Sequence, residues 1–238
     1  NVFYYPAKDI IFYNADIHGN LIVSQRMAVI KRMLEGEPVT VITTIDGLFD
    51  RLLPLEEIAK NRLIFRAEDV LPLEALSREL TAMGFERVSQ VESPGQFAVR
   101  GGILDIYNLA DECPYRLELW GDEIDSIRSF DAESQRSIEQ VDKVIIYPAM
   151  EYVMSAAVRD RGLKMIDQDM KRQVKRLKDG QNYETATRLT QVIAELKENL
   201  EISSASSGID SLVQYFYGHT VSFLSYFDRD DSLIVLDE

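Results

Sequence analysis

Between residues 87 and 147 the chain repeats one pattern, in which a short run of alternating apolar and polar residues ends at a pair of turn-forming residues. The turn pairs include Pro94-Gly95, Gly101-Gly102, Cys113-Pro114 and Gly121-Asp122. The runs cover residues 87–91, 96–100, 103–107, 115–120, 124–130 and 143–147. Short strands at such regular spacing predict an antiparallel sheet. A helix is expected over 73–83, ended by Gly84 and packed on that sheet.

The flanks of this region have a different texture. Residues 39–44 are rich in β-branched side chains and predict a buried parallel strand, with helices before it from Leu21 and after it to Leu53. Apolar residues at helical spacing on both sides of Gly180 predict an antiparallel helical hairpin, and a helix is expected over 209–217. The run 233–236 is typical of a buried strand.

We therefore predict an α/β fold with three parts. Residues 1–60 form the first segment of an α/β domain, and 61–150 form an inserted α+β domain with an antiparallel sheet. Residues 151–238 form the helical hairpin and the return segment. Because the chain starts at Asn1 rather than Met and has a strand-like run near its last residue, we expect it to be an excised module of a longer protein.

The charge is strongly negative and uneven. The net charge is −14, and residues 91–150 hold half of it, with five basic against twelve acidic side chains. Such acidity argues against tight, sequence-independent DNA binding, which depends on Lys and Arg neutralising phosphates. Cys113 is the single cysteine and cannot form an internal disulfide, so we expect a reducing, cytoplasmic environment. No apolar run is long enough to predict a membrane span.

Catalytic motifs are missing from the sequence. It contains no phosphate-binding loop and no dinucleotide fingerprint, so no cofactor site is predicted. His18 and His219 are expected in turns or loops and, with one cysteine, do not make a structural zinc site. Residues 233–238 have the form of a Walker B strand with Asp237 and Glu238, but a core strand entering an acidic turn is the favoured interpretation. We predict no catalytic residue and no metal ligand.

One basic run stands out against the acidic background. Lys and Arg residues recur from 171 to 178 along the first helix of the predicted hairpin. Such a run is usually the solvated side of a helix, although contact with nucleic-acid phosphates is the alternative.

The strand predicted over 115–120 carries the clearest candidate for a binding site. Alternation places Tyr115, Leu117 and Leu119 towards a core and Arg116, Glu118 and Trp120 on the opposite face. Arg100 falls on the polar face of the neighbouring strand. Trp and Arg are the residue types enriched in protein–protein hot spots, and Glu118 with nearby acids would add electrostatic selection. The alternative is that Trp120 folds back under a loop while the arginines form surface ion pairs.

These residues carry a family resemblance. G-Q-F-A-V-R-G-G-I-L-D-I-Y at 95–107, P-Y-R-L-E-L-W-G-D-E-I-D-S-I-R at 114–128 and F-D-A-E-S-Q-R-S at 130–137 resemble the UvrB-homologous module of bacterial transcription-repair coupling factors (Mfd). F-Y-Y-P at 3–6, Q-R at 25–26, the hairpin and residues 208–238 extend the resemblance to essentially the whole chain.

The resemblance implies a role in nucleotide excision repair. In that family the module recruits UvrA to RNA polymerase stalled at DNA damage, and its α/β part resembles a helicase lobe that has lost nucleotide binding. ATP and Mg²⁺, double-stranded DNA and RNA polymerase would bind other domains of the parent protein. By motif, the UvrA-binding residues would be Arg100, Arg116, Trp120 and their neighbour Glu118. The family often has Phe where Trp120 stands here.

The excinuclease subunit UvrB is the alternative, which would make this chain part of an ATP-dependent damaged-DNA-binding protein. Two features favour the coupling factor. The stretch F-D-x-x-S-Q-R-S is typical of it, and only residues 7–20 separate Pro6 from Leu21, which is too few for the long aromatic hairpin of UvrB. We expect a non-catalytic module.

Overall fold

The structure is a computed structural model that describes residues 2–7, 16–202, 212–228 and 230–236. The chain divides into two compact units. One comprises Asn1–Val153 together with Val221–Glu238, and the other comprises Met154–Thr220. The mixture of helices with an antiparallel sheet confirms the predicted α/β class, while the two-segment helicase-like layout and the boundaries at 60 and 150 stay predictions.

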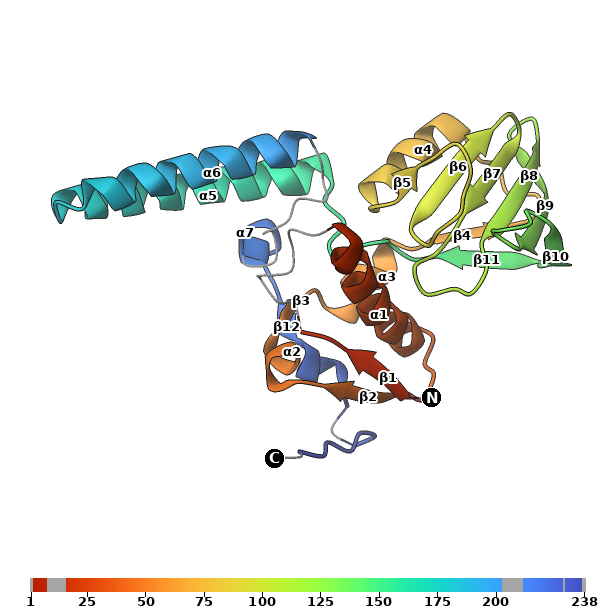
Figure 1. Cartoon of the computed structure of the whole chain (residues 1–238), viewed down its shortest axis with the longest axis horizontal. Helices are drawn as coiled ribbons and strands as arrows, with labels where there is room; N and C mark the ends of the chain where they lie inside the picture. Colours follow the sequence, from red (N-terminus) through yellow and green to blue (C-terminus); the bar gives the residue numbers. More distant parts are fainter. Residues whose placement is uncertain (1, 8–15, 203–211, 229, 237–238) are drawn as a thin grey trace. The chain divides into compact units, whose positions relative to one another are not determined.

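A six-stranded sheet dominates the first unit (Figure 1). Its strands are β5 (Glu86–Arg87), β6 (Gln96–Arg100), β7 (Ile103–Ile106), β8 (Tyr115–Trp120), β9 (Glu123–Phe130) and β10 (Ser137–Gln140), in the order β10-β9-β8-β7-β6-β5. All neighbours are antiparallel except β5 and β6. The predicted antiparallel sheet is confirmed. Strand β10 escaped prediction because all four of its residues are exposed, so it carries no apolar alternation.

Helix α4 (Leu73–Ala82) covers one face of this sheet. Its buried residues Leu76 and Leu80 join a core with Leu104, Leu117 and Ile127. Full burial of each such side chain contributes about 1.5–3 kcal/mol. The helix ends as predicted at Gly84, whose φ of +92° closes a turn in which the Phe85 amide bonds the Leu80 carbonyl at 3.0 Å.

The segment that carries the six-stranded sheet begins and ends at one place. Strand β4 (Leu63–Arg66) pairs antiparallel with β11 (Lys143–Ile146), so the two ends of this segment lie side by side. Strand β11 falls within the expected run 143–147, but it pairs with β4 in a separate two-stranded sheet.

The remaining part of this unit is built around α1 (Asp16–Leu34) and the parallel pair β1 (Val2–Tyr5) and β2 (Thr40–Thr43). Thr44 caps α2 (Ile45–Phe49) by accepting a hydrogen bond from the Gly47 amide at 3.3 Å. The other elements are β3 (Arg51–Leu52), which pairs with β12 (Val221–Ser222), α3 (Leu55–Lys60) and the short 3₁₀ helix η2 (Phe223–Tyr226).

Three expectations in this unit are wrong. The strand over 39–44 is parallel but not buried, since Ile42 is 59% exposed: in the part of the chain described, β2 pairs only with β1. His18 lies in helix α1, which starts at Asp16, and not in a turn. Residues 233–236 form no strand, because no described strand pairs with them, and Leu233 is 89% exposed. Asp237 and Glu238 lie outside the described residues.

The second unit is the predicted helical hairpin. Helix α5 (Ala156–Asp179) packs against α6 (Tyr183–Ile202), and Gly180 follows α5 as its C-cap. Ser155 caps α5 by accepting a hydrogen bond from the Val158 amide at 3.3 Å. The short helix α7 (Val213–Phe216), which falls within the predicted helix 209–217, contributes Phe216 to the core with Ile166 and Leu200. The serine-rich segment 203–208 lies outside the described residues.

A search of the described helices for length and sustained hydropathy finds none that could cross a membrane.

Candidate protein-binding surface

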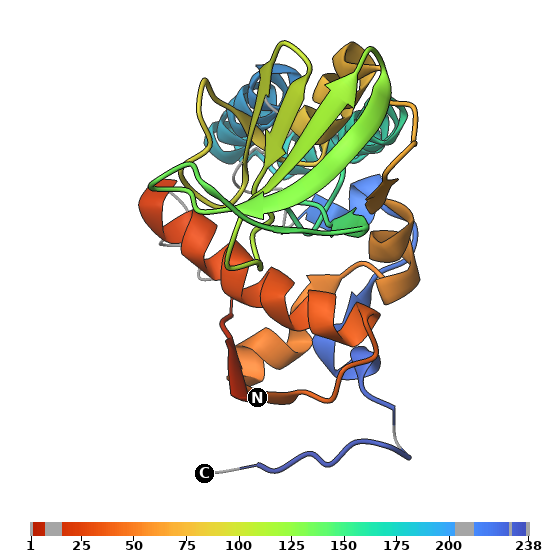
Figure 2. The same ribbon diagram turned by 90° about the vertical axis from the view of Figure 1, so that its right-hand side faces the viewer.

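The face of the six-stranded sheet opposite α4 brings the predicted site residues together. Strand register aligns Ala98, Asp105, Arg116 and Arg128 in one row across β6 to β9, and Arg100, Ile103, Glu118 and Ser126 in the next. The views in Figures 1 and 2 both show β8 and β9 side by side as long, twisted neighbours. Tyr115, Leu117 and Leu119 pack on the α4 side, which confirms the predicted alternation. We call Arg100, Asp105, Arg116, Glu118 and Trp120 the arginine–tryptophan face.

Asp105 is the anchor of this face. Its side chain is fully buried, and its carboxylate accepts hydrogen bonds from Arg116 Nε at 2.7 Å and Arg116 Nη2 at 2.9 Å. A third hydrogen bond comes from Arg100 Nη2 at 2.8 Å. Two parallel bonds from one guanidinium fix both distance and plane, and three cationic donors compensate the desolvation of the carboxylate.

Arg116 is enclosed more than the sequence predicted. Its side chain is only 16% exposed, lies 4.4 Å above the Phe130 ring and donates a hydrogen bond to Gln135 Oε1 at 3.2 Å. The hydrogen bonds to Asp105 raise the pKa of Arg116, against the opposing effect of burial. Sequence alternation placed Arg116 on an exposed face, and that part of the prediction is wrong because the loop after β9 covers it.

Trp120 and Arg100 are the exposed members. The Trp120 side chain is 86% exposed, which excludes the alternative that it folds under a loop. The Leu119 amide bonds the Gly102 carbonyl at 2.7 Å, which sets Trp120 beside the turn that follows Arg100. Gly102 is required there, since a Cβ would lie 2.8 Å from the Leu119 carbonyl oxygen. The Arg100 side chain is 44% exposed and tethered at one end by Asp105.

Glu118 lies in the same row of the sheet as Arg100 and on the same strand as Trp120. It accepts a hydrogen bond from Ser126 Oγ at 2.8 Å, and Arg128 Nη2 approaches its carboxylate at 3.7 Å. The acids Asp122, Glu123 and Asp125 are exposed on the adjoining turn and strand. The exposed part of this face therefore presents the guanidiniums of Arg100 and Arg128 and the indole of Trp120, with carboxylates around them.

Sequence reasoning gave no role to Asp105, Phe130 or Gln135. The available signal was Asp105 itself, an acid between Leu104 and Ile106 in a strand that is otherwise apolar. Gln135 has no comparable signal, because it reaches Arg116 through a turn in which its own φ is +59°.

The structure adds little support for the other candidate sites, which are the histidines and the basic run of α5. His219 lies in a loop, as expected, and the described residues include no group of three or more His, Cys, Asp or Glu side chains that could hold a metal ion. Lys171, Lys175 and Lys178 are exposed along α5, and phosphate binding by this run stays a prediction.

Known proteins are similar to this chain over the region that carries the arginine–tryptophan face. Residues 63–152 match the family model of the UvrB interaction domain, a range that contains the whole arginine–tryptophan face. The full chain is 32% identical to the transcription-repair-coupling factor of Bacillus subtilis, of which it covers 20%.

Two other relatives are a UvrABC system protein B and a second transcription-repair-coupling factor. The chain is 30% identical over 241 residues to UvrABC system protein B of Thermosipho africanus, covering 99% of this chain and 36% of that protein. It is 27% identical to a transcription-repair-coupling factor of Staphylococcus aureus, covering 98% of this chain and 20% of that protein. The chain thus spans a fifth to about a third of the length of these relatives.

Proposed function

Because residues 63–152 match the family model of the UvrB interaction domain, we propose that the chain is a non-catalytic recruitment module of a transcription-repair coupling factor that binds UvrA. Binding occurs at the arginine–tryptophan face and brings nucleotide excision repair to stalled RNA polymerase. ATP, Mg²⁺, RNA polymerase and double-stranded DNA are bound by other domains of the parent protein.

The observation that carries this proposal is the exposure of Trp120. An indole that is 86% exposed on an ordered strand leaves a large apolar surface in water, and covering it with a partner is favourable. Trp and Arg supply much of the binding energy where they have been tested in interfaces. Here Arg100 stands on the same face, and its tether to Asp105 reduces the side-chain entropy that binding would remove.

Arg116 acts in this proposal as a positioning residue. Its guanidinium is engaged by Asp105, Phe130 and Gln135, so little of it remains for a partner. It holds Asp105, which in turn holds Arg100. We therefore assign direct contact with UvrA to Trp120, Arg100 and Glu118.

Titration calorimetry with purified UvrA tests the assignment. Trp120→Ala should weaken binding by about 2 kcal/mol or more, close to a thirtyfold rise in Kd. Tyr183→Ala is the matched control, because Tyr183 is also an exposed aromatic but belongs to α6 in the other unit. Wild-type affinity in the double variant Arg100→Ala/Trp120→Ala would refute the site.

The similarity to UvrABC system protein B favours a second candidate, a fragment of an ATP-dependent damaged-DNA-binding protein. This alternative predicts salt-sensitive binding of a labelled single-stranded or lesion-containing oligonucleotide, weakened when Lys171 and Lys175 are changed to Glu. Absence of DNA binding at low salt, combined with UvrA binding, favours the recruitment module.

A further inference from the structure

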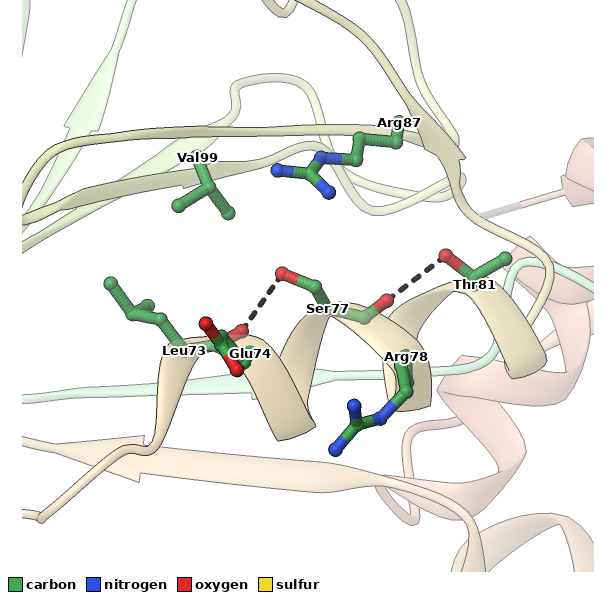
Figure 3. Close-up of a pocket in the computed structure, with 7 residues that line it drawn as sticks. All are labelled: Leu73, Glu74, Ser77, Arg78, Thr81, Arg87 and Val99. Carbon is green, nitrogen blue, oxygen red and sulfur yellow. Dashed lines mark hydrogen bonds between the residues drawn. The ribbon is translucent and has the colours of Figure 1, made fainter.

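A groove of about 550 Å³ runs between α4 and the edge of the six-stranded sheet, on the face opposite Trp120. Figure 3 shows the Arg87 guanidinium extending over the helix between Val99 and Ser77. One wall is formed by strand residues and the other by successive turns of α4. The lining residues are Leu73, Glu74, Ser77, Arg78, Thr81, Arg87 and Val99.

The sheet edge along this groove is open. Strand β5 has two residues and pairs with β6 only at Gln96 and Phe97. The Phe97 carbonyl accepts a hydrogen bond from the Val88 amide, so the backbone of Phe97 points towards the β5 side. Because backbone direction alternates along a strand, the N–H and C=O of Val99 point to the same side, where β5 has already ended.

The polar groups of the groove favour an acidic occupant that also donates hydrogen bonds. The structure gives Arg78 and Arg87 no ion pair or side-chain hydrogen bond with any described residue, and Glu74 is the one carboxylate in the lining. The hydroxyls of Ser77 and Thr81 donate to the carbonyls of Leu73 and Ser77, so their lone pairs face the groove as acceptors.

We propose that this groove binds an extended, acidic segment of a protein partner, which adds as a strand beside Val99 and sets a carboxylate against Arg87. Strand addition supplies backbone hydrogen bonds to Val99. Every second side chain of the segment faces α4, where an apolar side chain contacts Leu73 and Val99 and an acidic side chain contacts Arg87. Val99 and Trp120 face opposite sides of the sheet, so this surface is separate from the proposed UvrA site and does not depend on it.

A labelled peptide of sequence VTDTVTD is a suitable probe, since it combines β propensity with two carboxylates that lie on the same face of the strand as its two valines. Fluorescence polarisation should show binding, and replacing both Asp by Asn or introducing Arg87→Glu should weaken it by at least about tenfold. Arg136→Glu is the matched control: Arg136 is an exposed arginine of the same unit, outside the groove, and this change should leave the affinity unaltered.

Hydrogen exchange at the Val99 amide distinguishes strand addition from simple charge attraction. The peptide should slow exchange at this amide, which no strand among the described residues covers. The proposal is overturned by an absence of binding at about 1 mM peptide, by equal affinity for the Asn peptide, by insensitivity to Arg87→Glu, or by an unchanged Val99 amide.

Discussion

The carboxylate of Asp105 accepts two parallel hydrogen bonds from the guanidinium of Arg116, at 2.7 Å and 2.9 Å. The Asp105 side chain is fully buried. The same carboxylate holds Arg100. One buried charge therefore organises a face whose exposed residues lie on two other strands, β6 and β8. This arrangement makes the stability of the sheet and the geometry of the binding surface depend on the same group.

Removal of the buried carboxylate should destabilise the first unit strongly. Asp105→Ala leaves Arg116 enclosed without a counter-charge, and we expect the free energy of unfolding to fall by about 3 kcal/mol. Urea denaturation followed by circular dichroism measures the change. Asp142→Ala removes an exposed acid from the same unit and should have an effect below about 0.5 kcal/mol.

The two arginines should respond differently to replacement by lysine. Arg116→Lys loses the paired geometry and should lower stability by about 2 kcal/mol. Arg100→Lys, on a side chain that is 44% exposed, should change stability by less than about 0.5 kcal/mol. Equal losses in the two variants would show that Arg116 is not the structural partner of Asp105.

A second buried arginine, Arg26, joins distant segments of the first unit. Arg26 is fully buried, pairs with Glu151, contacts Asp50 Oδ2 at 2.6 Å and donates to the Pro6 carbonyl at 2.7 Å. Burial alone lowers the pKa of this guanidinium, but Glu151, Tyr5 and Asp50 together outweigh that effect and raise the pKa. Arg26→Met should therefore reduce the free energy of unfolding by about 3–5 kcal/mol.

A double variant separates the lost ion pair from lost packing around Arg26. Adding Glu151→Gln to Arg26→Met removes the negative charge that Arg26 had balanced and should recover part of the stability, about 1–2 kcal/mol. Additive losses from the two substitutions would show that the pair does not act as a unit.

Gly162 in α5 should resist the usual stabilisation by alanine. In a helix interior Gly→Ala is favourable by about 1 kcal/mol, but a Cβ here would lie 2.1 Å from the Phe216 ring. We expect Gly162→Ala to destabilise the hairpin by about 1–3 kcal/mol in thermal unfolding. Gly180→Ala, where the nearest atom to a Cβ is the Arg176 carbonyl at 3.4 Å, should be close to neutral.

Acidification should loosen the turn that covers Arg116. Hydrogen bonds from the hydroxyl and amide of Ser134 lower the pKa of Asp131 below its ordinary value. A depressed carboxyl pKa stabilises the fold above the ordinary value, and that stabilisation is lost as pH falls through the folded-state pKa. A carbon-13 NMR titration should show a low midpoint for Asp131 that moves part of the way back towards its ordinary value in Ser134→Ala, because this variant loses the hydroxyl but keeps the amide hydrogen bond.

Local sequence patterns were enough to predict most of the helices and strands and which face of the sheet packs on the core. Alternation assigned Leu117 to the core and Trp120 to the opposite face because side chains of successive strand residues must point in opposite directions. Turn-forming residues fixed where β6 and β8 end, and helical spacing fixed α4 and the hairpin. These signals are local, so they survive without knowledge of the fold.

Contacts between segments far apart in the sequence determine which charges are buried and which apolar residues are exposed. Asp105 became the anchor only when register set it between Ala98 and Arg116, and Arg116 was enclosed by a loop that reaches it through Gln135. Leu233 has the pattern of a strand but remains exposed because a strand needs a neighbour to satisfy its backbone. Pairing of this kind is a property of distant segments in contact, which local pattern does not encode.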